Sequence, residues 1–270
     1  MSASGKDLRM RHLLHRDTGT CILFAASHGT STATIFHELN QTADKVAAAI
    51  DGGADSVLIS PPIGRLCAGI LRERPHAGFV AKVSATAYES FRRETPIWSS
   101  EAAMVAGADG VGIMMQLIPE NEEAVIRLVA EYGEECERLG MPYIVEAELP
   151  GAYQANAWMP DDQVSYLRRA CRLAEELGAD IIKTNWPGSA DGFASIVAAV
   201  TKPVIVAGGP RIDDAQLLEI IDEAMRAGAI GASVGRNIFQ SPDPVRATAN
   251  IAAVVHNRTA VASVLAGGVR

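Results

Sequence analysis

The chain has 270 residues, of which 48% are hydrophobic and 21% are charged, and its formal net charge is −8. This length can form one large domain, and the acidic balance argues against nucleic acid or an anionic membrane surface as a general partner. No apolar run approaches the ~18 residues of a transmembrane helix, so no membrane association is predicted. The polar, basic stretch from Met1 to Asp17 lacks the apolar core of a secretory signal.

The four cysteines, Cys21, Cys67, Cys136 and Cys171, are far apart and form no C-x-x-C pair. Closely spaced cysteines or histidines are the usual sequence sign of structural zinc, so no metal site is predicted. Unpaired cysteines are typical of a reducing compartment, which predicts a cytoplasmic protein. We also expect no cofactor.

From Cys21 onward, short apolar runs rich in Val and Ile alternate with longer segments of helical periodicity. Near-continuous apolar character is typical of parallel strands that are buried on both faces. The eight runs predicted as strands are Cys21–Ser27, Ser56–Ser60, Phe79–Ser84, Gly110–Gln116, Tyr143–Leu149, Asp180–Trp186, Pro203–Gly208 and Gly231–Phe239. The predicted helices are His37–Gly52, Glu120–Leu139, Asp161–Leu177, Asp213–Ala227 and Pro242–His256.

A helix-Gly-Ala-strand joint recurs at Gly53, Gly107, Gly178 and Gly228, as in a repeated βα unit. Eight strands that alternate with helices predict the α/β fold of a (β/α)8 TIM barrel in a single domain over residues 1–270. An open doubly wound sheet is the alternative, but no Gly-rich fingerprint follows the first strand. Residues 1–20 are predicted to be an N-terminal extension, 3₁₀-like or a hairpin, that closes the bottom of the barrel.

Polar residues stand at the end of nearly every predicted strand. In a TIM barrel the active site lies at the carboxyl ends of the strands, so a full ring of polar ends indicates an active site. The strand-end residues are Ser27, His28, Ser60, Lys82, Ser84, Gln116, Glu146, Glu148, Lys183, Asn185, Gly208, Gly209, Gly235, Arg236 and Asn237.

Lys183 is a lysine near the end of an apolar strand. Burial disfavours its charged form, and a neutral amine is the nucleophile that forms Schiff bases with carbonyl substrates. The alternative is a lysine that extends to the strand end or pairs with a carboxylate. Period two places Glu146 and Glu148 on one face, and the helix-covered outer surface makes the lumen their expected side. Together with Lys82 they are acid/base candidates, although a purely structural Lys82–Glu146 ion pair is also consistent.

The last two strand ends carry the pairs Gly208-Gly209 and Gly235-Arg236. Glycine allows a ligand close to the backbone, and a phosphate site often lies after the seventh and eighth strands of this fold. Arg236 would add a forked donor for phosphate oxygens. The alternative is tight turn chemistry without a ligand.

Three motifs, Ile182-Lys183-Thr184-Asn185, Val206-Ala207-Gly208-Gly209-Pro210 and Gly235-Arg236-Asn237-Ile238-Phe239-Gln240, resemble the archaeal-type class I fructose-bisphosphate aldolases. That family is related to deoxyribose-phosphate aldolase. The stretch from Leu8 to Gly19 and the turn Ser27-His28-Gly29 also resemble its opening, so the resemblance extends over nearly the whole chain. We expect a divergent member of this family.

The resemblance implies that Lys183 forms a Schiff base with a ketone donor, and that Gly208, Gly209, Gly235 and Arg236 hold its phosphate. Two positions depart from the family pattern. Ser27 stands where the family has an aspartate, and Glu148 stands where it has a proton-transferring tyrosine. A buried carboxylate can move protons, so Glu148 is the first candidate for the proton shuttle, supported by Glu146 or Lys82.

We therefore predict a lyase, a class I aldolase that joins or cleaves a phosphorylated ketone, such as dihydroxyacetone phosphate, and an aldehyde. The departures suggest an amino-acid semialdehyde as the aldehyde. Ser27, His28, Gln116 and Asn185 are predicted to border the substrate. Fructose-bisphosphate cleavage, transaldolase- or thiolase-type transfer and a non-catalytic phosphometabolite-binding barrel are the alternatives. The expected partners are a small phosphorylated metabolite and further copies of the chain in a homo-oligomer.

Overall fold

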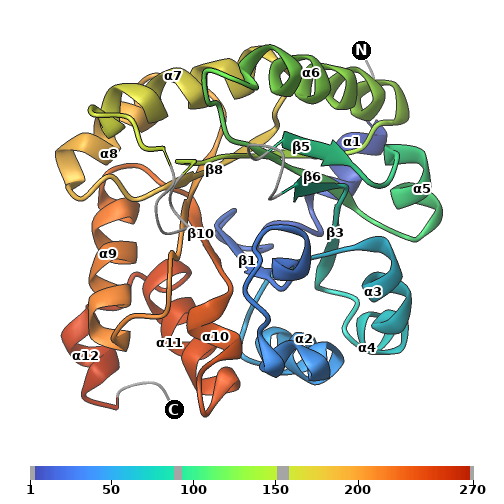
Figure 1. Ribbon diagram of the computed structural model, residues 1–270. Helices are drawn as coiled ribbons and strands as arrows, with labels where there is room; N and C mark the ends of the chain where they lie inside the picture. Colours follow the sequence, from blue (N-terminus) through green and yellow to red (C-terminus); the bar gives the residue numbers. More distant parts are fainter. Residues whose placement is uncertain (1–3, 88–92, 151–157, 268–270) are drawn as a thin grey trace.

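The computed structural model describes residues 4–87, 93–150 and 158–267 (Figure 1). Eight parallel strands close into a barrel in the order β1-β10-β9-β8-β7-β6-β3-β2. Their bounds are Cys21–Ala25 (β1), Ser56–Ile59 (β2), Gly78–Lys82 (β3), Gly110–Met115 (β6), Tyr143–Ala147 (β7), Ile181–Asn185 (β8), Val204–Ala207 (β9) and Gly231–Val234 (β10). The predicted TIM-barrel fold is confirmed.

Helices surround these strands on the outside (Figure 1). The five predicted helices are α2 (Thr42–Asp51), α6 (Glu122–Leu139), α7 (Gln163–Glu176), α9 (Asp214–Arg226) and α11 (Pro244–Val255). The others are α1 (Ser4–Met10), α3 (Pro61–Leu66), α4 (Ala68–Glu73), α5 (Ser100–Val105), α8 (Ala190–Val197), α10 (Arg236–Phe239) and α12 (Val261–Leu265), with 3₁₀ turns η1 (His28–Thr30) and η2 (His37–Gln41). None of the described helices is long and apolar enough to span a bilayer.

Two predicted strands are wrong at their ends. Strand β3 stops at Lys82, and β4 (Ser84–Ala87) then pairs antiparallel with β5 (Arg93–Pro96). The hydroxyls of Ser84 and Thr86 on β4 both donate to Glu94 of β5. The extended run after Gly231 ends at Val234. There Gly235 adopts φ −115° and ψ −83°, outside the strand region, and helix α10 begins.

The predicted form of the N-terminal extension is also wrong, because α1 is an α-helix rather than a 3₁₀ or hairpin piece. Lys6 and Arg9 lie three residues apart, on one side of this helix. Lys6 Nζ contacts Glu137 and Asp180, and Arg9 donates to the carbonyl oxygen of Gly140 at 2.8 Å. The helix therefore allows Lys6 and Arg9 to contact neighbouring parts of the barrel from one side of α1.

The recurring Gly-Ala-Asp joints hold the barrel strands at their amino ends. Gly53, Gly107 and Gly178 all have φ between 87° and 103°, which glycine adopts without a steric penalty. The aspartate of each joint then accepts a hydrogen bond from a backbone N–H of a neighbouring strand. The three pairs are Asp55 with Ile22 at 2.6 Å, Asp109 with Phe79 at 2.9 Å and Asp180 with Tyr143 at 2.9 Å.

The interior of the barrel is apolar over its lower half. Leu13, which precedes β1, packs into a buried cluster with Leu23, Leu58, Val80, Ile144, Ile181 and Ile205 from the strands. A second, larger apolar cluster lies between the strands and the helices. Apolar side chains thus fill the amino end of the barrel and the space beneath the helices. Most of the buried charged side chains lie at the carboxyl end of the barrel.

Candidate functional site

A cluster of four buried charges lies at the carboxyl ends of β3, β7 and β8. The register pairs Glu146 of β7 with Lys183 of β8, so their side chains leave the sheet side by side. Glu146 accepts hydrogen bonds from Lys82 Nζ at its Oε1 and from Lys183 Nζ at its Oε2, each at 2.6 Å. Lys183 Nζ also lies 2.8 Å from Oε1 of Glu148. The two ammonium and two carboxylate groups balance in charge.

The two ammonium groups determine the charge state of Glu146. Burial by itself raises the pKa of the Glu146 carboxyl, but the charges of Lys183 and Lys82 and their hydrogen bonds outweigh this and lower the pKa to about 2. Glu146 is therefore an anion at neutral pH. A change in the charge on Lys183 acts directly on this pKa, because Lys183 provides the largest lowering effect.

Glu148 follows β7 and is fully buried, and its charged partner within 4.0 Å among the described residues is Lys183. Its backbone N–H donates to the carbonyl oxygen of Met115 at 3.2 Å, and the next residue is held on two sides. Asn185 accepts from the Leu149 N–H at 2.6 Å, and Gln116 donates to the Leu149 carbonyl oxygen at 3.3 Å. Gln116 and Asn185 thus fix the chain that carries Glu148.

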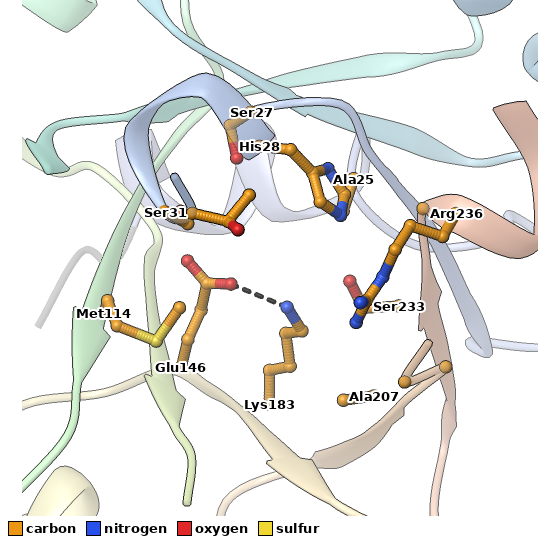
Figure 2. Close-up of a pocket in the computed structure, with 14 residues that line it drawn as sticks. Ala25, Ser27, His28, Ser31, Met114, Glu146, Lys183, Ala207, Ser233 and Arg236 are labelled. Atoms are coloured by element: carbon orange, nitrogen blue, oxygen red, sulfur yellow. Dashed lines mark hydrogen bonds and ion pairs between the residues drawn. The ribbon is translucent and has the colours of Figure 1, made fainter. Parts of the chain in front are cut away.

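A cavity opens in front of Lys183 (Figure 2). Its described lining is Ala25, Ser27, His28, Ser31, Thr32, Met114, Glu146, Lys183, Ala207, Gly208, Gly209, Ser233, Gly235 and Arg236. Lys183 and Glu146 point into it side by side, and Arg236 enters from α10 (Figure 2). Lys82 and Glu148 are not in this lining, but they contact Glu146 and Lys183, the two charged residues that face the cavity from β7 and β8.

His28 forms part of the wall opposite β8 and is a neutral imidazole. Burial and, to a smaller extent, the positive charges of Arg236 and Lys183 lower its pKa to about 3. Its ring stands edge-on to Phe36 and Phe239, at centroid distances of 5.3 and 5.0 Å. The buried Nδ1 has no hydrogen-bond partner among the described residues, so it is available to a ligand.

The glycines of the cavity leave room that a side chain would fill. A Cβ on Gly235 would lie 2.5 Å from both His28 Cε1 and the carbonyl oxygen of Ala25, and one on Gly208 would lie 3.1 Å from the Val234 side chain. Gly209 has φ +64°, a backbone angle that other residues rarely adopt. Glycine is therefore required here for packing and for backbone shape. Because glycine has no side chain, it also leaves space in the cavity beside Arg236.

Asn237 holds this glycine loop in place. It is 1% exposed, and its Nδ2 donates to the carbonyl oxygens of Gly208 and Pro210, each at 2.9 Å. Its Oδ1 accepts from the Ile212 N–H at 3.0 Å. The Gly-Arg-Asn motif thus joins the loop after β9 to the start of α10 and fixes Arg236 relative to the glycines.

The cavity also contains residues that the sequence interpretation missed. They are Ala25, Ser31, Thr32, Met114, Ala207 and Ser233. Period two contained a signal for two of them, because Ser233 shares a face with Gly235 and Met114 shares one with Gln116. Ser233 Oγ is buried and unpartnered among the described residues, so it offers the ligand a further hydroxyl.

A third buried glutamate, Glu94 of β5, stands near the cluster. Burial raises the pKa of its carboxyl, while the Lys82 charge and hydrogen bonds from Ser84 and Thr86 oppose that rise. Both of its oxygens accept a hydroxyl hydrogen bond, from Ser84 and Thr86 respectively. Glu94 is thus held by the hairpin, and it makes no ion pair within 4.0 Å among the described residues.

Comparison with known proteins shows the family of the chain. Residues 21–241 match the DeoC/LacD family aldolase, and the chain therefore belongs to this family of aldolases. A 2-amino-3,7-dideoxy-D-threo-hept-6-ulosonate synthase of Halobacterium salinarum is 33% identical over 95% of this chain and 94% of its own length. A 2-amino-4,5-dihydroxy-6-oxo-7-(phosphonooxy)heptanoate synthase of Streptomyces griseus is 35% identical over 59% of this chain and 57% of its own.

Solved structures support the fold. An archaeal fructose-1,6-bisphosphate aldolase with its catalytic lysine bound to a carbinolamine intermediate superposes with a TM-score of 0.79, at 22% identity, over 93% of this chain and 99% of that chain. A fructose-bisphosphate aldolase from Slackia heliotrinireducens gives a TM-score of 0.81, at 19% identity, over 98% and 90% of the two chains. The predicted family and the predicted aldolase class are confirmed.

Replacing Glu146→Gln is expected to destabilise the protein at pH 7 by about 3–5 kcal/mol, because two buried ammonium groups lose their shared anion. Glu146 has a native pKa of about 2, below its unfolded value of about 4.3, so its contribution is full above that value and is lost as the pH falls through about 2. The difference in unfolding free energy between the variant and the wild type should therefore shrink between about pH 4 and 2.

Urea denaturation at several pH values measures this difference. Glu123→Gln is the matched control, because Glu123 pairs with Arg127 on the surface and its side chain is 88% exposed. The control should stay within about 0.5 kcal/mol of the wild type at each pH. Equal stability of Glu146→Gln and wild type at pH 7 would contradict the charge assignment.

Proposed function

We propose that this chain is a Schiff-base aldolase in which Lys183 bonds the ketone carbon of a phosphorylated donor and the resulting enamine adds to an aldehyde. The observation that carries the proposal is the position of Lys183. Its amine lies on the cavity wall between a carboxylate pair and Arg236, whereas the second buried lysine, Lys82, lies outside the cavity. Membership of the aldolase family supports the reaction class.

Arg236 and the glycines beside it support a phosphate at one end of the donor. A guanidinium is a forked donor that suits phosphate oxygens. The glycines beside Arg236 have no side chains, so a tetrahedral phosphate has space to approach the guanidinium. Ser233 and His28 offer further polar atoms on the same side. The ketone between the phosphate and the reacting carbon would then lie within reach of Lys183.

The electrostatics of the cluster suggest how protons move in the first step. Glu148 contacts Lys183 Nζ from behind and takes its proton, which leaves a neutral amine to attack the ketone. A neutral nitrogen no longer lowers the pKa of Glu146, so Glu146 becomes able to receive a proton. The amine adds to the ketone carbon, and Glu146 carries a proton from the added nitrogen to the alkoxide oxygen, which gives the carbinolamine. The proton on Glu148 then passes by way of Glu146 to the carbinolamine hydroxyl, which leaves as water, and the positive iminium restores both carboxylates as anions.

The iminium draws electrons from the neighbouring carbon. Loss of a proton from that carbon gives an enamine, and the enamine forms a C–C bond to the aldehyde carbon while the aldehyde oxygen takes up a proton. Water then hydrolyses the new iminium and frees Lys183. Glu146 is the carboxylate of the cluster that faces the cavity, so it is the group placed to exchange these protons with the substrate.

The relatives suggest the acceptor. Both synthases named above are called after seven-carbon 2-amino keto acids, and the Streptomyces product has a 6-oxo group beside a 7-phosphonooxy group. An aldol bond between its C4 and C5 divides that product into dihydroxyacetone phosphate and a four-carbon amino-acid semialdehyde. We propose the same two classes of substrate for this chain. Assembly into a homo-oligomer and a cytoplasmic location stay predictions from the sequence.

The substrate proposal is tested by incubating the protein with dihydroxyacetone phosphate and a panel of aldehydes, followed by mass-spectrometric product detection. The panel contains aspartate semialdehyde, glyceraldehyde 3-phosphate and a simple uncharged aldehyde. A seven-carbon amino keto acid phosphate is the expected product, and it should be absent with Lys183→Met. Fructose bisphosphate as the main product would instead favour the glycolytic reaction, and no product with any aldehyde would contradict aldolase activity.

The division of roles predicts different behaviour for Glu148→Gln and Glu94→Gln. Without Glu148 the amine loses the carboxylate that is proposed to take its proton, so kcat should fall by about 10²- to 10⁴-fold. Raising the pH should restore part of this loss, because solvent base replaces the missing carboxylate. Glu94→Gln should keep the wild-type pH profile. A pH-rate profile of Glu148→Gln that parallels the wild type would show that the proton leaves Lys183 by another path.

A further inference from the structure

Three side chains from distant parts of the chain meet at the amino end of the barrel, opposite the Lys183 cavity. His15 belongs to the N-terminal segment, Asp55 directly precedes β2, and His256 follows α11. One potential ligand atom from each lies within 4.8 Å of the other two. Two imidazoles and one carboxylate form a donor set that suits divalent transition metals.

The spacing of the donors fits a small tetrahedral ion. Tetrahedral zinc with bonds of about 2.0–2.1 Å places its ligand atoms roughly 3.4 Å apart. His256 Nε2 lies 3.5 Å from Asp55 Oδ2, and the two imidazole rings stack with centroids 4.2 Å apart. An ion between the three side chains would require the two stacked rings to turn until the plane of each points at it, and the ligand atoms are already close enough for this.

Threonine hydroxyls hold the outer nitrogens of both rings. Thr20 Oγ1 lies 2.7 Å from His256 Nδ1, and Thr18 Oγ1 lies 3.0 Å from His15 Nδ1. A ligating histidine usually donates its second ring N–H to such a partner, which fixes the tautomer and aims the other nitrogen at the metal. His256 Nε2 also lies 3.3 Å from the carbonyl oxygen of Gly53, a contact that metal binding would replace.

A comparison of the three Gly-Ala-Asp aspartates shows what is special about Asp55. Asp180 is paired with the ammonium group of Lys6 at 2.9 Å, and Asp109 meets the partly exposed His12. Asp55 is more deeply buried and has no Lys or Arg partner among the described residues; its side-chain contacts are the Ile22 N–H and His256. A buried carboxylate must be neutralised by a proton or by a cation, and a metal ion would supply the cation.

A cavity of about 820 Å³ gives access to the cluster from outside. Its lining includes His15 and Asp55 together with His12, Arg11 and His76. An ion can therefore enter without unfolding of the barrel, and a water molecule has space to occupy the fourth ligand position.

We propose that His15, Asp55 and His256 bind one Zn²⁺ ion at the amino end of the barrel. The ion joins the N-terminal segment, the start of β2 and the end of α11, which are 40 to 241 residues apart in the sequence. It acts as a structural clamp and takes no part in the reaction at Lys183, which lies at the other end of the strands. Metal binding to a folded site also raises the melting temperature by mass action.

The test uses the full-length protein after treatment with a chelator and dialysis. Titration calorimetry with Zn²⁺ should show one ion per chain, and Co²⁺ in the same site should give the strong visible absorption of a tetrahedral complex. His15→Ala should weaken Zn²⁺ binding by at least about 10- to 100-fold, the loss that removal of even an outer partner causes. His15 is partly exposed in the N-terminal segment, so this variant spares the core.

His76→Ala is the matched control, because His76 lines the same cavity but is not one of the three proposed ligands. It should bind Zn²⁺ as the wild type does. His256→Asn, which keeps a polar side chain, should lose binding as His15→Ala does. The absence of one-to-one binding, equal binding by His15→Ala and wild type, or an equal loss in His76→Ala would overturn the proposal.

Discussion

The shared hydrogen bonds of Glu146 with Lys82 and Lys183 are the interaction on which the carboxyl end of the barrel depends. Without Glu146, the buried ammonium group of Lys82 would have no carboxylate within 4.0 Å among the described residues, and Lys183 would keep only Glu148. Burial of an unpaired charge is among the largest penalties known in proteins. Strand register makes the arrangement possible, because Glu146 and Lys183 are direct partners on β7 and β8. The same contacts that stabilise the fold also prepare the amine for chemistry.

The balance of charges suggests why the site can change its protonation during a reaction. Lys183 is held by two carboxylates, and removal of its charge alters the environment of both. Glu146 is fixed by Lys82 on its other oxygen, so it stays in position when Lys183 becomes covalently bound. The apolar plug around Leu13 and Ile144 separates this cluster from the polar groups at the amino end.

Periodicity and turn chemistry were sufficient to predict the eight strands and the barrel. The strand ends also predicted residues that line the cavity, among them Lys183, Glu146, Gly235 and Arg236, because this fold usually has its site at those ends. Predictions failed where a single glycine or a hairpin changed the chain direction. At Gly235 the predicted strand becomes a helix, and after Lys82 the predicted strand becomes the β4–β5 hairpin.

Whether a buried strand-end residue faces the cavity depends on its position in the folded barrel, which the hydrophobic pattern of a sequence does not contain. Lys82 and Lys183 both look like buried strand lysines in the sequence, yet only Lys183 lines the cavity. Asn185 and Gln116, predicted to border the substrate, hold the backbone of Leu149 instead of lining the Lys183 cavity. The His15, Asp55 and His256 cluster has no sequence signature, because its three members come from separate segments.

The most direct test of the central claim is borohydride reduction in the presence of dihydroxyacetone phosphate, followed by peptide mapping. Borohydride converts a transient iminium into a stable amine, so the modified lysine can be identified by mass. The account predicts one adduct, on Lys183, with Lys82 unmodified. No covalent adduct, or an adduct on Lys82 in place of Lys183, would contradict it.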